Sequence, residues 1–371
     1  MSLKNWSDSG YIEREFKFFK RMNELYGINY TIVSYGDKRD FDYCNSLDYV
    51  KVIPIYEYIK QKKNIIYNFL ILPLSFQKLI KTLKIDFDVI KTNQLYGAWM
   101  ALFTKREFKK PLIIRTGYDL FTFSIKDKKN ILKRVAYYFL TLISLNYSNL
   151  FTVTSKSDFK FIKKYYFFDK KKIEIRSNWV DNFGDLKELP KDKLKILAVG
   201  RLEKQKDYKY LIKTFRNSEY QLDIVGSGSL RNELGTISSN NIKFLGNLNF
   251  SELDKLYSDY LFYISSSDFE GNPKSILEAM SKGCIVIAPN HENITEIIDH
   301  RYNGILYSKE KNNPLELIQE LINDNKALKK ISKNAIEHTI KNNSIELFLN
   351  NEIADYRRVA KIKGFEVNGN L

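Results

Sequence analysis

The chain has 371 residues, 44% hydrophobic and 28% charged, a balance that excludes a disordered chain, a collagen-like repeat and a small disulfide-stapled scaffold. Its two cysteines, Cys44 and Cys284, lie far apart with no CxxC spacing, so we expect neither a disulfide framework nor a zinc ribbon. Sixty Lys and Arg against 44 Asp and Glu give a net charge of +16.

The positive charge is concentrated in one part of the chain. Residues 51–150 hold 18 basic and 6 acidic side chains, whereas residues 251–300 hold 3 and 9. This asymmetry indicates a polyanionic partner, such as nucleic acid, an anionic membrane surface or a phosphorylated substrate. An AT-rich genome, whose codons favour Lys, Asn, Ile, Tyr and Phe, explains the composition equally well. The first 30 residues lack a secretory signal and no apolar run reaches about 18–20 residues, so we expect a soluble or peripheral cytoplasmic protein.

Short apolar, β-branched runs alternate with helix-period segments from end to end. The expected strands of the first half are Tyr30–Tyr35, Val50–Ile55, Asp88–Asn93, Leu112–Thr116, Leu150–Ser155 and Ile173–Asn178. Helical patterns between them include Ile12–Leu25, Ile65–Leu83, Asn130–Leu145 and Lys156–Tyr166. The second half continues with strands at Lys195–Val199, Leu222–Val225, Ile242–Leu245, Leu261–Ser265, Cys284–Ala288 and Gly304–Tyr307.

Such alternation predicts an α/β protein with parallel, doubly wound sheets covered by helices on both faces. Gly184, Pro190 and a mixed charge run interrupt the periodicity at Asn182–Asp192 and indicate a linker. We therefore predict domains at 1–186 and 187–343, separated by a cleft. A last helical stretch, Ser344–Val359, begins a segment 344–371 that we expect to pack back on the first domain.

Two strand ends of the second half carry residues suited to a diphosphate. The strand ending at Val199 runs into Gly200, Arg201 and Lys206, and such strand ends face the ligand crevice of a doubly wound sheet. Arginine and lysine on one loop can converge on a diphosphate, although a solvated basic turn explains them too. The next strand ends in Gly226–Ser227–Gly228, which lets the backbone approach a nucleotide or simply makes a tight turn.

The most specific segment runs from Ser265 to Met280. Asn272 is a good N-cap residue and Pro273 a good first helical residue, so we expect a helix to begin here and its free N–H groups to suit phosphate. Glu270 precedes this helix and Glu278 lies about a turn and a half inside it. Both carboxylates can accept paired hydrogen bonds from vicinal hydroxyls of a sugar or ribose, whereas a lone helix glutamate is usually only solvated.

Together these blocks resemble the retaining family 4 glycosyltransferases (glycosyl transferases group 1). GRLEKQKD, VGSGSLRNEL, FLGNL, EGNPKSILEAMSKG and IVIAPNHENITEII follow one another in that family's order over roughly residues 194–307. The resemblance weakens in the first half, to Thr154–Ser155 and Asn178–Trp179–Val180–Asp181. It implies the GT-B fold: two Rossmann-like domains, the N-terminal one on the acceptor side and the C-terminal one binding a nucleotide-sugar donor.

The resemblance also implies roles for matching positions. Arg201 and Lys206 would neutralise the donor diphosphate, and Glu270 would contact the transferred sugar, so we predict these three as catalytic. The predicted donor-binding residues are Gly200, Gly226, Gly228, Gly271, Asn272 and Glu278, with Glu278 on the ribose. The implied reaction moves a hexose-type sugar to a saccharide or lipid-linked acceptor, with retention, in bacterial surface polysaccharide or glycolipid synthesis. The departing phosphate would assist delivery of the acceptor, so no protein nucleophile is expected.

The first half departs from the family pattern. The family's usual first strand and glycine pair are cut short here, because only Ser7–Asp8–Ser9–Gly10 stands in their place before the first predicted helix. The segment Gly117–Tyr118–Asp119 follows a strand at a position where many relatives have histidine. We predict Gly10 and Asp119 as acceptor-side residues and no catalytic histidine. Two segments, Asp40–Phe41–Asp42 and Asp86–Phe87–Asp88, resemble a DxD metal motif. The first lies in a predicted polar loop and the second in a turn at the start of a predicted strand, so we expect no metal and no other cofactor.

The sequence leaves two other functions open. A GT-B nucleotide-sugar epimerase would share the fold, but it would use acid/base residues rather than the Glu-x7-Glu pattern. A nucleic-acid-binding protein would need a recognition helix or a stacking sheet, and no motif indicates one, so we expect no nucleic-acid partner. An anionic membrane is the expected partner of the basic segment, with Lys60, Lys62, Lys63, Lys105, Arg106, Lys109 and Lys110 as candidate contacts. The sequence does not specify the nucleotide base, the donor sugar or the acceptor.

Overall fold

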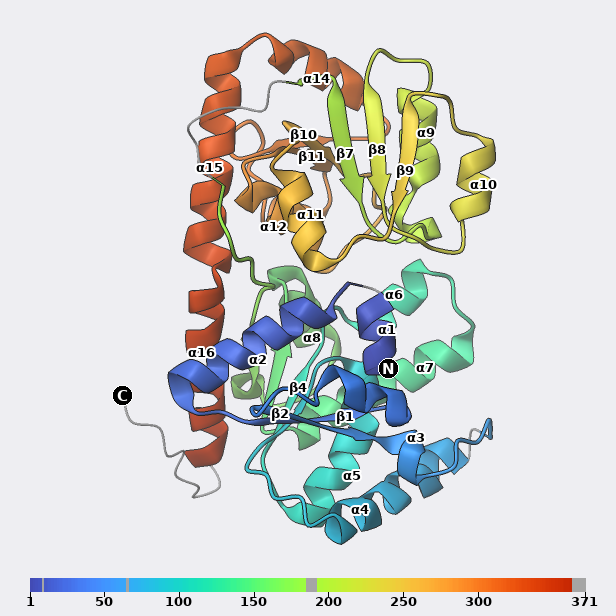
Figure 1. Ribbon diagram of the computed structural model, residues 1–371, viewed down its shortest axis with the longest axis vertical. Helices are drawn as coiled ribbons and strands as arrows, with labels where there is room; N and C mark the ends of the chain where they lie inside the picture. Colours follow the sequence, from blue (N-terminus) through green and yellow to red (C-terminus); the bar gives the residue numbers. More distant parts are fainter. Residues whose placement is uncertain (9, 65–66, 185–191, 362–371) are drawn as a thin grey trace. The chain divides into compact units, whose positions relative to one another are not determined.

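The computed structural model describes residues 1–8, 10–64, 67–184 and 192–361, and these divide into two compact units (Figure 1). The first unit comprises Met1–Thr154, Asp158–Arg176 and the described residues from Leu349 on. The second comprises Ser155–Ser157 and Ser177–Phe348. Residues 185–191 of the predicted linker lie outside the described part of the chain.

A six-stranded parallel sheet with the order β9-β8-β7-β10-β11-β12 forms the centre of the second unit. Numbered within the unit this is 3-2-1-4-5-6, the order of a dinucleotide-binding sheet, and its direction of winding reverses between β7 and β10. All residues of β10 and β11 are buried, as expected for strands covered on both faces. The strands are β7 (Lys195–Val199), β8 (Gln221–Val225), β9 (Ile242–Gly246), β10 (Phe262–Ile264), β11 (Ile285–Pro289) and β12 (Ile305–Tyr307).

Two apolar clusters cover the two faces of this sheet. One includes Phe215, Phe262 and Ile318, and the other includes Tyr263 and Met280. Adjacent strand residues such as Phe262 and Tyr263 point to opposite faces, so each strand contributes to both clusters. The helices are α9 (Tyr208–Phe215), α10 (Arg231–Thr236), α11 (Phe250–Tyr257), α12 (Lys274–Ser281), α13 (Glu292–Thr295), α14 (Pro314–Ile322) and α15 (Asn325–Asn343).

The first unit contains a four-stranded parallel sheet, β3-β4-β5-β6, and a separate parallel pair, β1-β2. Its strands are β1 (Tyr30–Ser34), β2 (Val50–Pro54), β3 (Ile90–Thr92), β4 (Leu112–Arg115), β5 (Leu150–Val153) and β6 (Ile173–Ile175). Its helices are α2 (Ile12–Tyr26), α3 (Ile55–Tyr58), α4 (Leu72–Thr82), α5 (Ala98–Phe108), α6 (Leu120–Lys126), α7 (Ile131–Tyr147) and α8 (Lys156–Tyr165), with a π-helix at Tyr67–Ile71. Each of the twelve strands predicted from the sequence is present.

The chain begins with a helix, α1 (Leu3–Asp8), that the sequence reading did not predict. The buried Asp40 carboxylate accepts hydrogen bonds from the amides of Leu3 at 3.0 Å and Lys4 at 3.3 Å, and from Ser34 Oγ at 2.6 Å. These bonds satisfy amides that a helix start leaves without intrahelical partners. Asp40 was one half of the DxD-like pair, and the structure uses it to hold the N-terminal helix.

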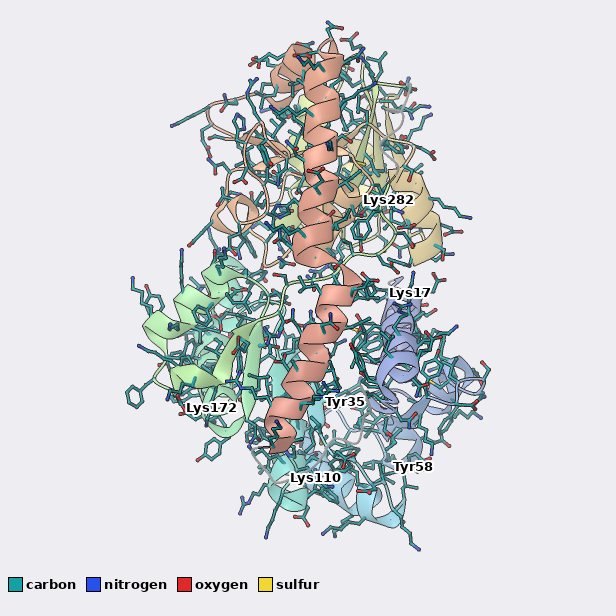
Figure 2. The ribbon with its side chains drawn as sticks, turned by 90° about the vertical axis from the view of Figure 1, so that its left-hand side faces the viewer. Lys17, Tyr35, Tyr58, Lys110, Lys172 and Lys282 are labelled. Atoms are coloured by element: carbon teal, nitrogen blue, oxygen red, sulfur yellow. The ribbon has the colours of Figure 1, made fainter. Side chains whose placement is uncertain are left out.

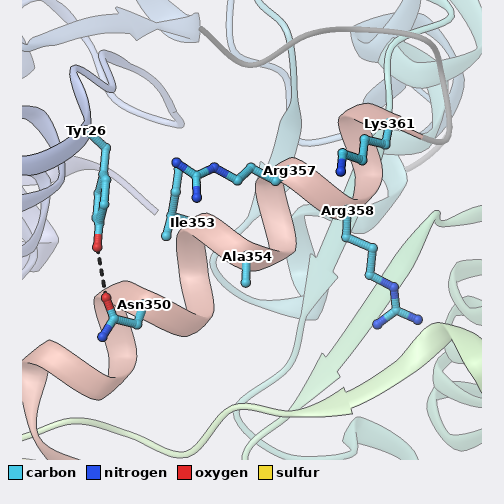
Figure 3. Close-up of a pocket in the computed structure, with 7 residues that line it drawn as sticks. All are labelled: Tyr26, Asn350, Ile353, Ala354, Arg357, Arg358 and Lys361. Carbon is cyan, nitrogen blue, oxygen red and sulfur yellow. Dashed lines mark hydrogen bonds between the residues drawn. The ribbon is translucent and has the colours of Figure 1, made fainter. Parts of the chain in front are cut away.

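The last helix, α16 (Ile345–Lys361), contributes most of its length to the first unit, where it lies between the segments that carry Lys172 and Tyr35 (Figure 2). Arg176 forms a bidentate pair with Asp355 at 2.8 and 2.7 Å, and Lys91 pairs with Glu352. Tyr26 Oη donates to Asn350 Oδ1 at 2.9 Å beside an open hollow along this helix (Figure 3). Within the described residues, no helix combines the length and apolar character needed to cross a bilayer.

Candidate active site

The loops that follow β7 and β10 are bonded to each other at the point where the strand order reverses. The Asp268 amide donates to the Gln205 carbonyl at 2.9 Å, and Gln205 Nε2 donates to the Phe269 carbonyl at 2.7 Å. Ser266 Oγ donates to the Lys206 carbonyl at 2.7 Å. Ligands of open α/β sheets bind outside the carboxyl ends of the strands at such a reversal. The predicted diphosphate loop and the predicted sugar loop are therefore joined by hydrogen bonds along one edge of the sheet.

Lys206 and Glu270 meet across this edge. Lys206 Nζ lies 2.5 Å from Glu270 Oε1, and their side chains are only 17% and 9% exposed. A largely buried cation and carboxylate compensate each other's loss of water. The pair places a positive group suited to phosphate oxygens directly beside an acceptor suited to sugar hydroxyls.

Arg201 and Gly200 belong to the same loop as Lys206. The Arg201 side chain is exposed, and no hydrogen bond or ion pair joins its guanidinium to another residue in the described ranges. A Cβ on Gly200 would lie 3.0 Å from Tyr208 Oη and 3.3 Å from Lys206 Cε, so this glycine leaves room for the buried stem of Lys206. The loop thus carries the paired Lys206 together with the exposed Arg201.

Gly226 and Gly228 pack against the loop after β7. A Cβ on Gly226, whose φ is 134°, would lie 2.1 Å from the Gly200 carbonyl oxygen, and one on Gly228 would lie 2.5 Å from that of Leu202. The Leu202 amide donates to the Ser227 carbonyl at 2.8 Å. From the sequence, these two glycines were expected to leave space for a nucleotide. In the structure, neighbouring backbone occupies the space where a Cβ of either residue would lie. These glycines are required by contact between the two loops.

The helix after Glu270 begins later than expected. α12 starts at Lys274, and its N-cap residue is Pro273, whose side chain makes no capping bond. Asn272 is not the N-cap, because its side-chain oxygen accepts from the Asn178 amide at 2.9 Å and its carbonyl accepts from Asn178 Nδ2 at 2.6 Å. This long-range amide pair outcompetes local capping. It joins Asn272 of the Gly271–Asn272 segment to the Asn178–Asp181 segment that the family resemblance had singled out.

Glu278 lies in the middle of α12 and is partly exposed. Tyr257 Oη donates to Glu278 Oε2 at 3.3 Å, and burial raises the pKa of Tyr257 far above its usual value, with the Glu278 charge adding to the effect. The tyrosine therefore stays a neutral donor that orients the carboxylate. Tyr263 Oη makes a similar link nearby, to Ser275 Oγ at 2.9 Å.

The sequence reading missed a second ion cluster at the same edge. Lys309 Nζ lies 2.5 Å from Asp207 Oδ2 and 2.7 Å from Asp268 Oδ1. It therefore bridges Asp207, which follows Lys206, and Asp268, which lies two residues before Glu270. Burial alone would lower the pKa of Lys309, but its hydrogen bonds to both carboxylates outweigh burial and raise it. Lys309 follows the end of β12, and a cation just after a strand end was the available signal.

The acceptor-side predictions, Gly10 and Asp119, occupy structural positions in the first unit. Asp119 is fully buried and caps α6, accepting from the Thr122 amide at 2.7 Å and from Thr122 Oγ1 at 2.8 Å. Burial raises the pKa of Asp119 despite these bonds. Gly10 has a φ of 71°, and its amide donates to the Ser7 carbonyl at 2.9 Å.

The candidate metal motifs do not gather ligands. Asp86 is exposed, its carboxylate accepting from the Phe87 amide at 2.9 Å and lying 3.7 Å from Lys110 Nζ. Over the described ranges, no group of three or more His, Cys, Asp or Glu side chains is arranged to hold a metal ion.

Residues 184–338 match the family described as Glycosyl transferases group 1, and this match confirms the resemblance read from the sequence. The solved structure of Anabaena Alr3699/HepE in complex with UDP and glucose has the same fold, with a TM-score of 0.68 at 17% identity over 88% of this chain and 90% of that one. The chain therefore has the GT-B fold, and its residues 184–338 are similar to the group 1 glycosyltransferases.

Two curated relatives extend the similarity into the first unit. An uncharacterized glycosyltransferase of Methanocaldococcus jannaschii is 28% identical over 291 residues, covering 70% of this chain and 72% of that protein. The N-acetylgalactosamine-N,N'-diacetylbacillosaminyl-diphospho-undecaprenol 4-alpha-N-acetylgalactosaminyltransferase of Campylobacter jejuni is 27% identical over 297 residues, covering 74% and 78%.

Proposed function

We propose that the protein is a retaining, metal-independent hexosyltransferase that moves a sugar from a nucleotide-sugar donor to a saccharide or lipid-linked acceptor. The observation that carries this proposal is the Lys206–Glu270 pair at the strand reversal. The Campylobacter relative is named for a diphospho-undecaprenol acceptor, and the Anabaena protein binds UDP and glucose. We therefore favour a uridine nucleotide donor and an acceptor used in bacterial surface polysaccharide or glycolipid synthesis at the cytoplasmic membrane face.

The donor would be held by charge and by hydrogen bonds. Arg201 and Lys206 would bind the diphosphate, and Glu270 would accept from hydroxyls of the transferred hexose. Glu278, oriented by Tyr257, would accept from the ribose hydroxyls. Backbone N–H groups at the start of α12 would add positive potential, and its N-cap residue Pro273 makes no side-chain capping bond.

In the proposed reaction the bond between the sugar's anomeric carbon and the diphosphate oxygen breaks. The bond to the acceptor oxygen forms on the same face, and the acceptor proton passes to the departing phosphate. Negative charge grows on the diphosphate as it leaves, so the cations act mainly in the transition state. No protein nucleophile is required.

A donor panel tests the proposal. Purified protein is incubated with UDP-, GDP- and ADP-sugars, with and without a polyprenyl-diphosphate sugar acceptor. Nucleotide release that requires acceptor, with an α-linked product from an α-linked donor in the NMR spectrum, supports retaining transfer. Conversion of the nucleotide sugar into its epimer without acceptor would overturn it, and so would an inverted anomeric configuration in the product.

A matched pair of variants ties the activity to the site. Lys206→Met should abolish most transfer, whereas Lys204→Met, two residues earlier on the same loop and exposed, should retain it. Equal loss in both variants would assign the effect to loop charge in general rather than to the Lys206–Glu270 pair.

A further inference from the structure

Lys309 joins the two loops that carry the proposed donor contacts. It follows β12, an edge strand of the six-stranded sheet, and only 17% of its side chain is exposed. A lysine is rarely buried to this degree unless its charge is paired. Its ammonium contacts Asp207, the residue after Lys206, and Asp268, two residues before Glu270. Lys309 therefore contacts chain neighbours of the two site residues that form the ion pair.

An aromatic platform holds Lys309 in this position. Its ammonium lies 5.2 Å from the centroid of the Tyr210 ring, within the range of a cation–π contact. The Tyr210 ring is nearly parallel to that of Tyr307, with 6.1 Å between centroids and 11° between planes. Tyr307 is buried, and its hydroxyl donates to the carbonyl of Ser265, the residue after β10, at 2.9 Å. The position of the lysine is therefore set by α9, β12 and the end of β10 as well as by the two aspartates.

Asp207 turns this contact into a constraint on the Lys206 loop. Its backbone has a φ of 46° and a ψ of 48°, a left-handed conformation that is unfavourable for a residue with a Cβ. Its Oδ1 accepts from the Tyr210 amide at 3.4 Å at the start of α9, and its carbonyl accepts from Ser266 Oγ at 3.0 Å. Lys309 binds the other carboxylate oxygen. The turn after Lys206 is therefore held by side chains that follow β10 and β12.

Asp268 provides the matching constraint on the Glu270 loop. Its amide donates to the Gln205 carbonyl, and its Oδ1 binds the Lys309 ammonium. Because one ammonium contacts both carboxylates, removing it would leave two like charges facing each other, and their repulsion would favour separation of the loops. The bridge from Asp207 through Lys309 to Asp268 therefore opposes that separation.

We propose that Lys309 is a positioning residue of the donor site, which keeps Lys206 and Glu270 facing each other by joining their loops through the two aspartates. This role rests on the proposed function, because it requires that the Lys206–Glu270 pair acts on a nucleotide sugar. Misplacement of a group by about 1 Å can cost about 100-fold in rate. A broken bridge should therefore lower kcat even where the donor still saturates the protein.

Two variants of opposite charge separate positioning from a direct effect of charge on the donor. Lys309→Met removes a positive charge beside the proposed diphosphate site, whereas Asp268→Ala removes a negative one. A direct effect of charge would slow transfer in the first variant and leave it unchanged or faster in the second. Loss of the bridge should instead lower kcat about tenfold or more in both. The double variant should be no slower than the slower single variant, since both changes break the same bridge.

A matched lysine and a conservative replacement serve as controls. Lys311, two residues after Lys309, is exposed, so Lys311→Met makes the same change of charge without breaking the bridge. Its kcat and KM should equal those of the unmodified chain. Lys309→Arg should recover most of the lost kcat, because a guanidinium fork can bind two carboxylates.

Transfer rates over a range of donor concentrations give kcat and KM, and circular dichroism confirms that each variant is folded. Hydrogen exchange of backbone amides, measured without donor, gives a readout that does not depend on activity. Amides in residues 204–208 and 266–271 should exchange faster in Lys309→Met and Asp268→Ala than in the unmodified chain or Lys311→Met.

The outcomes distinguish the role of Lys309 from the proposed function. If the unmodified chain transfers sugar, the proposed function stands. Unchanged kcat in both Lys309→Met and Asp268→Ala, or opposite changes in the two, would then overturn the role of Lys309 alone. Absence of transfer by the unmodified chain with every donor would overturn the proposed function and this role with it.

Discussion

Lys206 Nζ and Glu270 Oε1 lie 2.5 Å apart across the strand reversal of the second unit, although 64 residues separate them in the chain. Both belong to the proposed donor site, so each holds its partner in place before the donor arrives. A diphosphate would draw Lys206 away from Glu270 and release the carboxylate for sugar hydroxyls. Pre-orientation of this kind lowers the reorganisation needed during the reaction.

Glu270→Gln and Glu278→Gln should each leave a folded protein with impaired transfer. Loss of one charge-assisted hydrogen bond costs about 1.5–3 kcal/mol, or roughly 10- to 150-fold in kcat/KM. Initial rates over a range of donor concentrations measure the effect, and circular dichroism confirms folding. Glu292→Gln, at an exposed position of the same unit, is the control. Full activity in a folded Glu270→Gln/Glu278→Gln double variant would contradict the site.

Gly228→Ala should destabilise the free protein by about 3 kcal/mol, because its Cβ would lie 2.5 Å from a backbone oxygen that cannot rotate away. Gly246→Ala is the control, since its Cβ would meet nothing within 4 Å and only its φ of 75° carries a cost, about 1 kcal/mol. Urea unfolding without nucleotide compares the two. Unchanged stability in Gly228→Ala would mean that its glycine serves the nucleotide alone.

The strands were predictable from the sequence because their signal is local. The apolar run Ile285–Pro289, for example, is buried at every position. The missing features depend on residues distant in the chain. α1 requires Asp40, and the displaced N-cap at Pro273 requires Asn178.

The candidate site divides in the same way. Arg201, Lys206, Glu270 and Glu278 could be named from motif order, and the structure brings Lys206 and Glu270 into contact. Lys309 belongs to no such motif, and its only signal was its position just after a strand end; its two carboxylate partners lie 102 and 41 residues away in the chain. Asp119 was predicted as an acceptor-side residue because it follows a strand where many relatives have histidine, and the structure shows its carboxylate buried as the N-cap of α6.

Transfer activity should survive chelation by EDTA. In the proposed site, Arg201, Lys206 and the start of α12 offset the diphosphate charge, while the Asp40 carboxylate is committed to α1 and Ser34. The assay compares untreated protein with protein dialysed against EDTA. Loss of activity that Mn²⁺ or Mg²⁺ restores would show that a metal carries part of this charge.

The stability of the first unit should depend on pH through Glu352. Burial alone would raise the pKa of this carboxyl, but the ion pair and hydrogen bond with Lys91 outweigh burial and hold it below the ordinary 4.5. The unfolded chain regains the ordinary value, so ionised Glu352 stabilises the fold fully above pH 4.5 and progressively less as the pH falls toward its folded pKa.

Glu352→Gln should therefore cost about 3 kcal/mol at neutral pH, because it leaves Lys91 unpaired, and this cost should shrink as the medium is acidified. Urea unfolding at a series of pH values, followed through Trp6 and Trp99 of the first unit in a Trp179→Phe background, measures it. Asp355, one turn further along α16, is the control. Burial raises the pKa of Asp355 above 3.8 despite Arg176, so the cost of Asp355→Asn should grow in acid. A Glu352→Gln cost that is constant from neutral to acid pH would show that the Glu352 charge does not contribute.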